Sequence, residues 1–305
     1  MPAPTLRVLT WNLFHGRDGL PGLGATRAST WRRRPVEDGT HVHLNRKLTD
    51  LMADRVAAWA PDVAALQEVP TAAIPAIVRR TGMHAVWTTT GPLLGPRRLR
   101  DMLAARNPDL WRTHEGNANV LLAGPRWLPV GGSERSARLN SLSAIVRAAV
   151  DLELDAGELL RYLPEPRRAV LARVRGPGGA EAAVACVHLH NARHEALTER
   201  ELDVAAAALA GLAGEGTPMV LAGDLNRDAR HPAIAALADE GWGGVAAGDA
   251  LGIDRVLFRG LEAVEPPRCL PAAEREVTAT YGGVSRRVRL SDHDPVIATL
   301  RVSAS

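Results

Sequence analysis

Short runs of apolar residues recur along the chain, and a polar turn follows each run. The length and the β-branched content of these runs predict β-strands, several of them buried on both faces of a sheet. The expected strands cover residues 6–11, 63–66, 119–123, 169–174, 183–187, 219–222, 253–258 and 296–300.

Amphipathic segments lie between these strands. Residues 46–60 and 195–213 repeat apolar side chains at spacings near 3.6 residues, which predicts helices with one buried face. A shorter helix is expected over 232–240. The amphipathic stretch 139–150 could cover the core, form a dimer interface or contact a membrane, in that order of preference.

The order of these elements predicts the organisation of the chain. Short turns join several neighbouring strands, which favours mixed, partly antiparallel sheets over a doubly wound parallel sheet. There is no internal repeat or low-complexity linker, so a single domain is expected over residues 1–305. Residues 15–44, 91–116 and 131–167 are predicted to be inserted loops that shape a binding site or cover a surface.

Composition narrows the class of protein. No apolar stretch reaches the roughly 18 residues of a membrane-spanning helix, so no transmembrane segment is expected. The N-terminus lacks a signal-peptide pattern, and Cys186 and Cys269 are the only cysteines, which favours a cytoplasmic protein. The net charge of +3 permits a polyanionic partner without requiring one, and no protein partner is implied.

Polar side chains occur where the expected strands begin or end. Strand ends on a shared sheet edge are where α/β folds collect catalytic groups, and the oxygen ligands among these side chains suit Mg²⁺. Each short motif is also typical of a turn or a helix cap. The polar groups are Asn12, Gln67-Glu68, 188–191, 223–226, Asp254 and 291–295.

Taken together, these segments resemble the endonuclease/exonuclease/phosphatase superfamily, whose members include deoxyribonuclease I, AP endonucleases, sphingomyelinases and inositol polyphosphate 5-phosphatases. The resemblance covers residues 6–300 and implies an α/β fold of the α+β type. It would be a four-layered sandwich of two packed mixed β-sheets flanked by helices, with the site along one edge. The matching pieces are 10–13, 66–69, 116–122, 187–189, 223–226, 253–256 and 291–295, in family order.

The resemblance implies a phosphoesterase that uses Mg²⁺, with Mn²⁺ as a second candidate. It implies a metal held mainly by Glu68, with help from Asn12 and Asp292. The implied catalytic residues are His188 on the scissile phosphate, Asp224 and Asn226 on the attacking water or the phosphate oxygens, and Asp254 paired with His293. Either His293 or Asp224 could accept the proton, and one metal or two could be bound.

Some positions depart from the family pattern or are shared with only part of it. His188 places the chain nearer to the deoxyribonuclease I, sphingomyelinase and deadenylase branches than to AP endonucleases. The acidic partner of this histidine in deoxyribonuclease I has no counterpart, and Asn117 or Asn119 could substitute, although strand-edge hydrogen bonding is their expected role. Arg168, which resembles a phosphate-contacting arginine, and Asn191 are predicted to contact the substrate.

A phosphodiester substrate is expected, and arginines at 32–34 and 97–98 favour nucleic acid, cleaved by an endonuclease or exonuclease. A lipid or sugar-phosphate phosphodiesterase is the alternative within the superfamily. A catalytically silent binding module is another. A zinc hydrolase is disfavoured because the His188-x-His190 pattern lacks its following aspartate. A lipid enzyme would need exposed aromatic side chains, and the candidates are Trp31, Trp87, Trp111 and Trp127.

Overall fold

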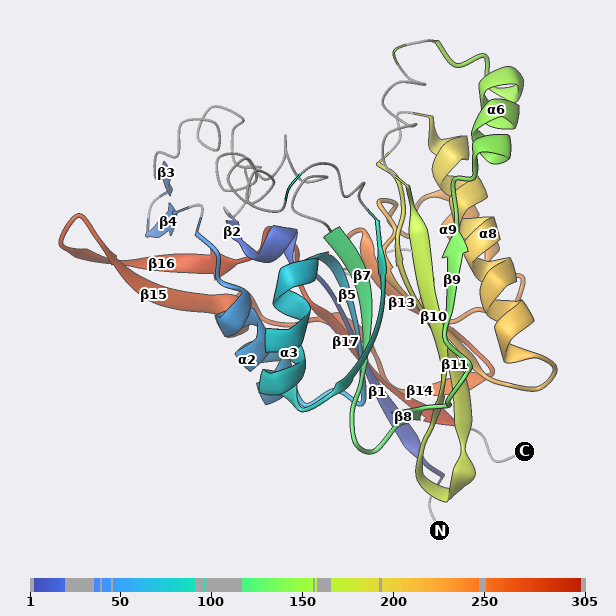
Figure 1. The fold of residues 1–305 in the computed structure, drawn as a ribbon, viewed down its shortest axis with the longest axis horizontal. Coiled ribbons are helices and arrows are strands. Elements are labelled where there is room, and N and C mark those ends of the chain that lie inside the picture. The colour runs from blue at the N-terminus through green and yellow to red at the C-terminus, as the bar shows by residue number, and fades with distance from the viewer. Residues whose placement is uncertain are drawn as a thin grey trace.

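A computed structural model of the chain describes residues 3–19, 36–38, 40–44, 46–90, 96, 117–155, 157, 166–191, 194–246 and 251–302. Within these ranges two mixed β-sheets pack face to face, and helices cover both outer faces (Figure 1). This arrangement confirms the predicted four-layered sandwich.

The first sheet has the strand order β14-β17-β1-β5-β7-β6. Its central strands, β1 and β5, are parallel, and the first and last strands of this sheet along the chain, β1 and β17, are antiparallel neighbours. The strands are β1 (Thr5–Asn12), β5 (Val63–Pro70), β6 (His84–Thr89), β7 (Asn117–Ala123), β14 (Leu261–Cys269) and β17 (Val296–Val302).

The second sheet has the order β13-β12-β11-β10-β8, and β9 also pairs with β10. Here β11 and β12 are parallel, so their carboxyl ends reach the same edge. The strands are β8 (Leu128–Pro129), β9 (Arg135–Arg138), β10 (Arg168–Arg175), β11 (Glu181–His188), β12 (Met219–Asp224) and β13 (Asp254–Arg259). Strand β9 lies inside the segment predicted to be the third insertion.

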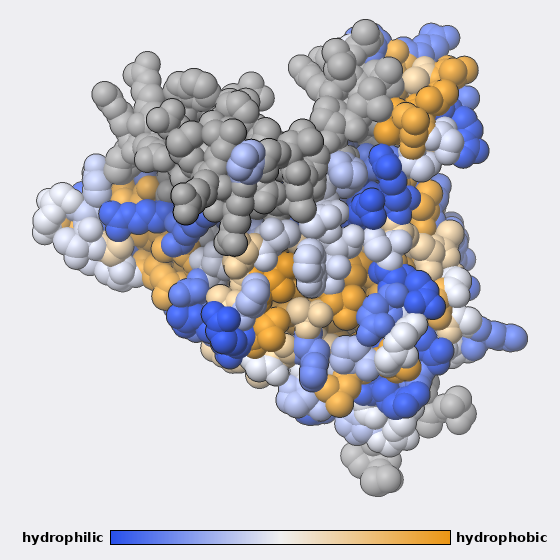
Figure 2. Space-filling model, viewed as in Figure 1, coloured by the Kyte–Doolittle hydropathy of each residue, from blue (hydrophilic) through white to orange (hydrophobic). Residues whose placement is uncertain are grey.

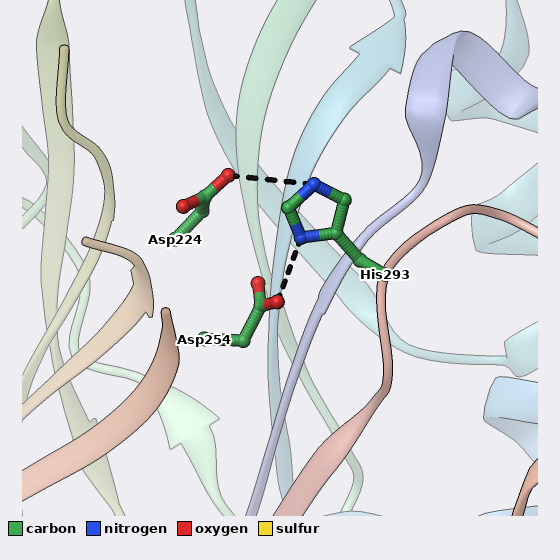
Figure 3. A group of neighbouring side chains, drawn as sticks. All are labelled: Asp224, Asp254 and His293. Atoms are coloured by element: carbon green, nitrogen blue, oxygen red, sulfur yellow. Dashed lines mark hydrogen bonds and ion pairs between the residues drawn. The ribbon is translucent and has the colours of Figure 1, made fainter. Parts of the chain in front are cut away.

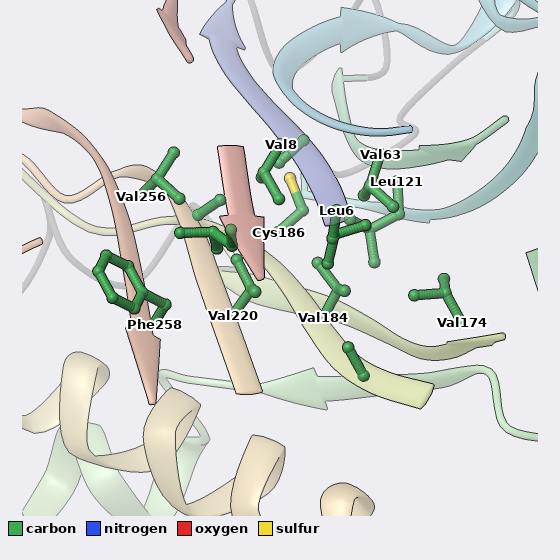
Figure 4. Packing of buried hydrophobic residues seen from close by; sticks show 14 of the residues in the cluster. Leu6, Val8, Val63, Leu121, Val174, Val184, Cys186, Val220, Val256 and Phe258 are labelled. Atoms are coloured by element: carbon green, nitrogen blue, oxygen red, sulfur yellow. The ribbon is translucent and has the colours of Figure 1, made fainter. Parts of the chain in front are cut away.

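Alternation along β1 shows how the sequence builds the layers. Leu6 and Val8 point into the core between the two sheets, where they meet Val184 and Val220 of the second sheet (Figure 4). The intervening residues, such as Trp11, point to the other face and pack under helices. This two-residue period is the reason that a continuous apolar run can be buried on both faces.

A small polar cluster interrupts the apolar core between the sheets. The side-chain amide of Gln67 is fully buried and donates to Thr10 Oγ1 at 3.2 Å and to Cys186 Sγ at 3.3 Å. Burial raises the pKa of the Cys186 thiol to about 12, so this cysteine stays a neutral thiol, in agreement with the buried position predicted for it.

Two pairs of helices cover the outer faces of the sandwich. On the first sheet lie α2 (Thr49–Trp59) and α3 (Ile74–Thr81), and on the second lie α8 (Glu195–Ala213) and α9 (Pro232–Ala236). Helices α2 and α8 confirm two predicted helices. Helix α9 ends earlier than predicted, because turns follow it up to Gly241 at φ 81°.

Helix α6 (Leu142–Asp151) falls within the predicted amphipathic stretch. Its Ile145 and Ala148 pack on Leu197 of α8, which confirms that one face covers the core. No helix among the described residues is long and apolar enough to cross a membrane. Short 3-10 helices are η1 (Phe14–Gly16), η2 (Thr71–Ala73), η3 (Pro177–Gly179) and η4 (Ala272–Arg275).

The described residues also form a third, smaller sheet that the sequence pattern did not predict. The hairpin of β15 and β16 projects to the left in Figure 1, and β2 and β4 of the predicted first insertion pair with β16. Its strands are β2 (Asp18–Gly19), β3 (Val36–Asp38), β4 (His41–His43), β15 (Glu276–Tyr281) and β16 (Val284–Leu290). The arginines at 32–34 and 97–98, and the tryptophans at 31 and 111, lie outside the described residues.

Candidate active site

Strand register brings the predicted polar residues to one edge of the sandwich. Asn12 lies beside Gln67 in the parallel pair of β1 and β5, and His188 lies beside Asp224 in that of β11 and β12. Asp224 in turn pairs with Asp254 across β12 and β13. Strands far apart in the sequence therefore place their polar ends together, at the end of the sandwich away from both termini (Figure 1).

One histidine links two carboxylates in this site (Figure 3). His293 Nδ1 lies 2.7 Å from Asp254 Oδ2, and His293 Nε2 lies 3.8 Å from Asp224 Oδ2. Burial disfavours the charged imidazole, but the charge and hydrogen bond of Asp254 and the charge of Asp224 outweigh it. The pKa of His293 is therefore raised well above its usual value. The ring is a cation at neutral pH.

Asp224 is the most connected carboxylate of the site. Asn12 donates its side-chain amide to Asp224 Oδ2 at 3.0 Å, and the backbone N–H of Asn226 donates to Oδ1 at 2.9 Å. His188 Nε2 is 3.5 Å from Oδ2. Burial, opposed by the charge of His293, raises the pKa of Asp224 to about 7, so this carboxyl can exchange a proton near neutral pH.

Glu68 lies next to this group and contacts two histidines. Its Oε1 is 3.9 Å from His188 Nε2, and its Oε2 is 3.0 Å from His15 Nε2. The pairing of β5 with β7 is interrupted between Leu66 and Val69, and such bulges turn a side chain out of its regular direction. The bulge therefore aims Glu68 into the site.

The backbone at this edge is unusually strained. A left-handed φ is rare for residues other than glycine and costs on the order of 1–3 kcal/mol, and such residues often mark functional sites. At this edge the angle is left-handed at five such residues: Phe14 (45°), His15 (54°), Glu68 (53°), Asn226 (52°) and Ser291 (67°). The clustering is consistent with a backbone held in place to position functional groups.

The loop before β17 is fastened to β1. Ser291 Oγ donates to the Asn12 carbonyl at 2.6 Å and accepts from the backbone N–H of His293 at 3.1 Å. Asp292 is 30% exposed, with Oδ1 3.9 Å from His293 Nε2. Asp294 binds Arg275, which explains how two acids can stand so close together.

The remaining predicted residues surround this group at different distances. The Asn226 side chain donates to the Leu189 carbonyl at 2.8 Å and ties the loop after β12 to the loop after β11. Arg168 opens β10, in a register that places it beside the end of β11, and Asn191 is exposed on the following loop. Neither of these two is placed at the buried carboxylates by any contact described above.

Two asparagines considered as partners for His188 have other contacts. Asn119 donates to the Arg168 carbonyl at 2.7 Å, the strand-edge role expected for it. Asn117 Oδ1 lies 2.9 Å from His15 Nδ1. His15 is the site residue that the sequence reasoning missed, because it opens a segment read as an insertion. Its position three residues after Asn12 was the available signal.

The donor set fits a hard divalent cation. Among the described residues, Asp224, Asp254 and His293 offer ligand atoms that all lie within 4.8 Å of one another. Asp254 Oδ1 is buried and has no hydrogen-bond partner there. Carboxylate and amide oxygens predominate at this edge, whereas the histidine pattern of a zinc hydrolase does not form: the backbone N–H of His190 donates to the buried Glu201 beneath α8.

Comparison with known proteins gives one sequence family. The sequence model described as "Endonuclease/Exonuclease/phosphatase family" matches residues 9–293. No curated protein matches the chain.

Solved structures share the fold at low sequence identity. A family protein from Bacteroides thetaiotaomicron has a TM-score of 0.63 at 14% identity, with 100% of both chains covered. The catalytic domain of human nocturnin with a bound sulfate anion has a TM-score of 0.63 at 14% identity, covering 99% of this chain and 96% of that one. A mannosyl-6-phosphatase of Bacteroides thetaiotaomicron has a TM-score of 0.61 at 13% identity, covering 97% and 99%.

Proposed function

Because the chain belongs to the endonuclease/exonuclease/phosphatase family, we propose that it is a metal-dependent phosphodiesterase and, within that class, a nuclease. The observation that carries the proposal is the meeting of Glu68, His188, Asp224 and His293 at one edge. A phosphodiester is anionic and repels nucleophiles. Its hydrolysis therefore needs positive charge beside the phosphoryl oxygens and a group that accepts a proton from water.

Glu68, with Asn12 and Asp292, would hold the cation, which we propose to be Mg²⁺, with Mn²⁺ as a substitute. When bound, such a cation offsets phosphoryl charge and makes a nearby water more acidic. The hydrogen bond of 2.7 Å between His293 and Asp254 would have to break for a cation to lie between them. That pair is better suited to orienting the imidazole, so we assign the cation to Glu68.

Asp224 is the better candidate for the proton acceptor. A base works best when its pKa is close to the ambient pH, and the pKa of Asp224 is raised to about 7 by burial. His293 has a pKa raised well above its usual value, against burial, by Asp254 and Asp224. A cationic imidazole can donate to a phosphoryl oxygen, as can His188 when protonated. Asn226, whose N–H binds Asp224, would keep the acceptor in place.

Nucleic acid is the substrate we favour. Arg168 stands at the active edge, the chain carries a net charge of +3, and cationic side chains along the phosphate backbone are what a nuclease needs. Asn191, exposed beyond β11, is placed to contact a substrate at the rim. Cys186 and Cys269 are both free thiols, which is consistent with a cytoplasmic location.

One observation favours a lipid phosphodiester as a second candidate. Leu142, Val146 and Val150 are 63%, 55% and 73% exposed and form one stripe of α6. Figure 2 shows apolar surface there, at the upper right. The helix follows a segment bonded to the site, since Asn140 accepts from the Arg167 N–H and the Arg167 guanidinium reaches the His188 carbonyl. An apolar rim suits a lipid surface. Among the tryptophans considered, Trp127 is buried and Trp87 is 49% exposed.

Turnover of bis-p-nitrophenyl phosphate tests the activity. We expect hydrolysis that requires Mg²⁺, disappears in EDTA and is abolished by Glu68→Gln. The matched control is Glu181→Gln at the opposite end of β11, which should retain activity. Turnover that survives Glu68→Gln would refute the metal assignment, and a chain inactive with every divalent cation would be a silent binding module.

The substrate class is tested by parallel digestion of plasmid DNA, single-stranded DNA, RNA, sphingomyelin vesicles and a sugar phosphate with Mg²⁺. We expect cleavage of nucleic acid that weakens as salt concentration rises. Intact nucleic acid together with hydrolysed sphingomyelin would transfer the assignment to the lipid class. In that case, aspartate at Val146 should reduce lipid turnover and leave bis-p-nitrophenyl phosphate hydrolysis unchanged.

A further inference from the structure

His15 is held at both ring nitrogens. Its Nδ1 lies 2.9 Å from Asn117 Oδ1, and its Nε2 lies 3.0 Å from Glu68 Oε2. The ring is 2% exposed and Asn117 is 3% exposed, so water does not compete for either contact. The side chain therefore links the start of β7 to the carboxylate that we assign to the cation.

The backbone is distorted where it delivers this side chain. Phe14, His15 and Gly16 adopt left-handed φ angles in succession, 45°, 54° and 70°. Asn12 Oδ1 accepts the N–H of Phe14 at 2.9 Å, and the N–H of Leu48 binds the carbonyl of Gly16 at 2.7 Å. Successive left-handed residues are unfavourable and persist only when surrounding contacts hold them.

We propose that His15 is a positioning residue that fixes the Glu68 carboxylate for the cation. Donation from Nε2 to Oε2 sets the rotation of the carboxylate and leaves Oε1 facing His188 and, beyond it, Asp224. Asn117 sets the orientation of the ring. Residues that hold a metal-binding side chain through a hydrogen bond typically change metal affinity by about 10- to 100-fold when they are replaced. The inference rests on the proposed role of Glu68.

Two substitutions separate the contacts of His15. The asparagine side chain ends near the position of Nδ1, and the glutamine side chain reaches the position of Nε2. His15→Asn therefore preserves a polar partner for Asn117 and removes the contact with Glu68, whereas His15→Gln preserves a donor toward Glu68. Both keep a polar group in the buried site. A change confined to loop stability would affect both variants alike.

The measurement is direct binding of Mn²⁺ to the full chain, read from the electron paramagnetic resonance signal of free Mn²⁺, with thermal unfolding in EDTA as a check on the fold. We expect His15→Asn to weaken Mn²⁺ binding about tenfold and His15→Gln to stay within about threefold of the wild type. The control is His41→Gln, which breaks the other His–Glu contact of 2.9 Å, with Glu276 in the third sheet, and should not change Mn²⁺ affinity.

The outcomes separate the two assignments. If Glu68→Gln leaves Mn²⁺ binding unchanged, the cation is not at Glu68 and the proposed function fails at that point. If Glu68→Gln abolishes binding while His15→Asn binds like the wild type, or more tightly, the role of His15 is refuted. Should His15→Asn fail to fold, Asn117→Ala takes its place. It should weaken Mn²⁺ binding several-fold by releasing the ring, and unchanged binding would refute the inference.

Discussion

Replacing Asp224 by asparagine should stabilise the metal-free protein at neutral pH while abolishing catalysis. The unfolded chain ionises this carboxyl with its usual pKa of 3.8, whereas burial raises the folded pKa to about 7. A raised folded pKa means that the folded state holds the proton more tightly. Stability from this group is therefore complete below the unfolded pKa and is lost progressively as pH rises to the folded pKa.

The structure gives the size of the effect. A shift of about 3 units corresponds to roughly 4 kcal/mol of free energy lost by pH 8, and asparagine avoids this loss. Asparagine has a single amide oxygen, so it cannot accept from both Asn12 and the Asn226 N–H, which costs about 1–2 kcal/mol. The lost attraction to His293 lowers the gain further. We expect a net stabilisation on the order of 2 kcal/mol at pH 8 and a slight destabilisation at pH 4.

Urea unfolding in EDTA at several pH values measures this difference. The free energy of unfolding of the variant, minus that of the wild type, should rise by up to about 1.4 kcal/mol per pH unit between roughly pH 4 and 7, and then level off. Asp228→Asn is the control of opposite sign, because hydrogen bonds from Arg230 lower the pKa of Asp228. A difference for Asp224→Asn that does not change with pH would refute the reasoning.

Three further changes follow from contacts in the structure. Asp254→Asn removes the partner that raises the pKa of His293, so the limb of the pH–rate profile that reports this imidazole should move to lower pH; an unmoved limb would contradict the pairing. Gly223→Ala would place a Cβ 1.9 Å from the Val187 carbonyl oxygen of the neighbouring strand. It should lower the urea midpoint by the equivalent of about 2 kcal/mol or more, unlike alanine at the unobstructed Gly211. Trp127→Ala empties a fully buried site and should cost about 3–5 kcal/mol of unfolding free energy, and a loss below 1 kcal/mol would show that the core collapses around it.

The layers were predictable where strands are buried on both faces. In β1 and β5 every position is apolar or packs against a neighbour, so the run is continuous and its polar end residues stand out. Family order then predicted that Glu68, Asp224 and Asp254 belong to one site, and the structure brings them together through His188 and His293.

The parts that were missed lack such a pattern. Strands β15 and β16 carry threonines and arginines on half-exposed faces, so their alternation is not one of apolar and polar residues. Helix α3 is only 8 residues long, too short to show a helical period. His15 depends on left-handed backbone angles and on a contact with Asn117 across a sequence separation of 102, and neither is encoded in local spacing.

The pairing of β1 with β17 has a consequence for synthesis. During translation β1 leaves the ribosome first, and until the final strand follows, its edge lacks that partner and the Ser291 clasp on Asn12 is absent. A partly made chain therefore carries Glu68 and Asp224 without His293. Hydrolytic competence should arise abruptly, with the last residues of the domain, so an incomplete polypeptide would be harmless to the messenger that encodes it.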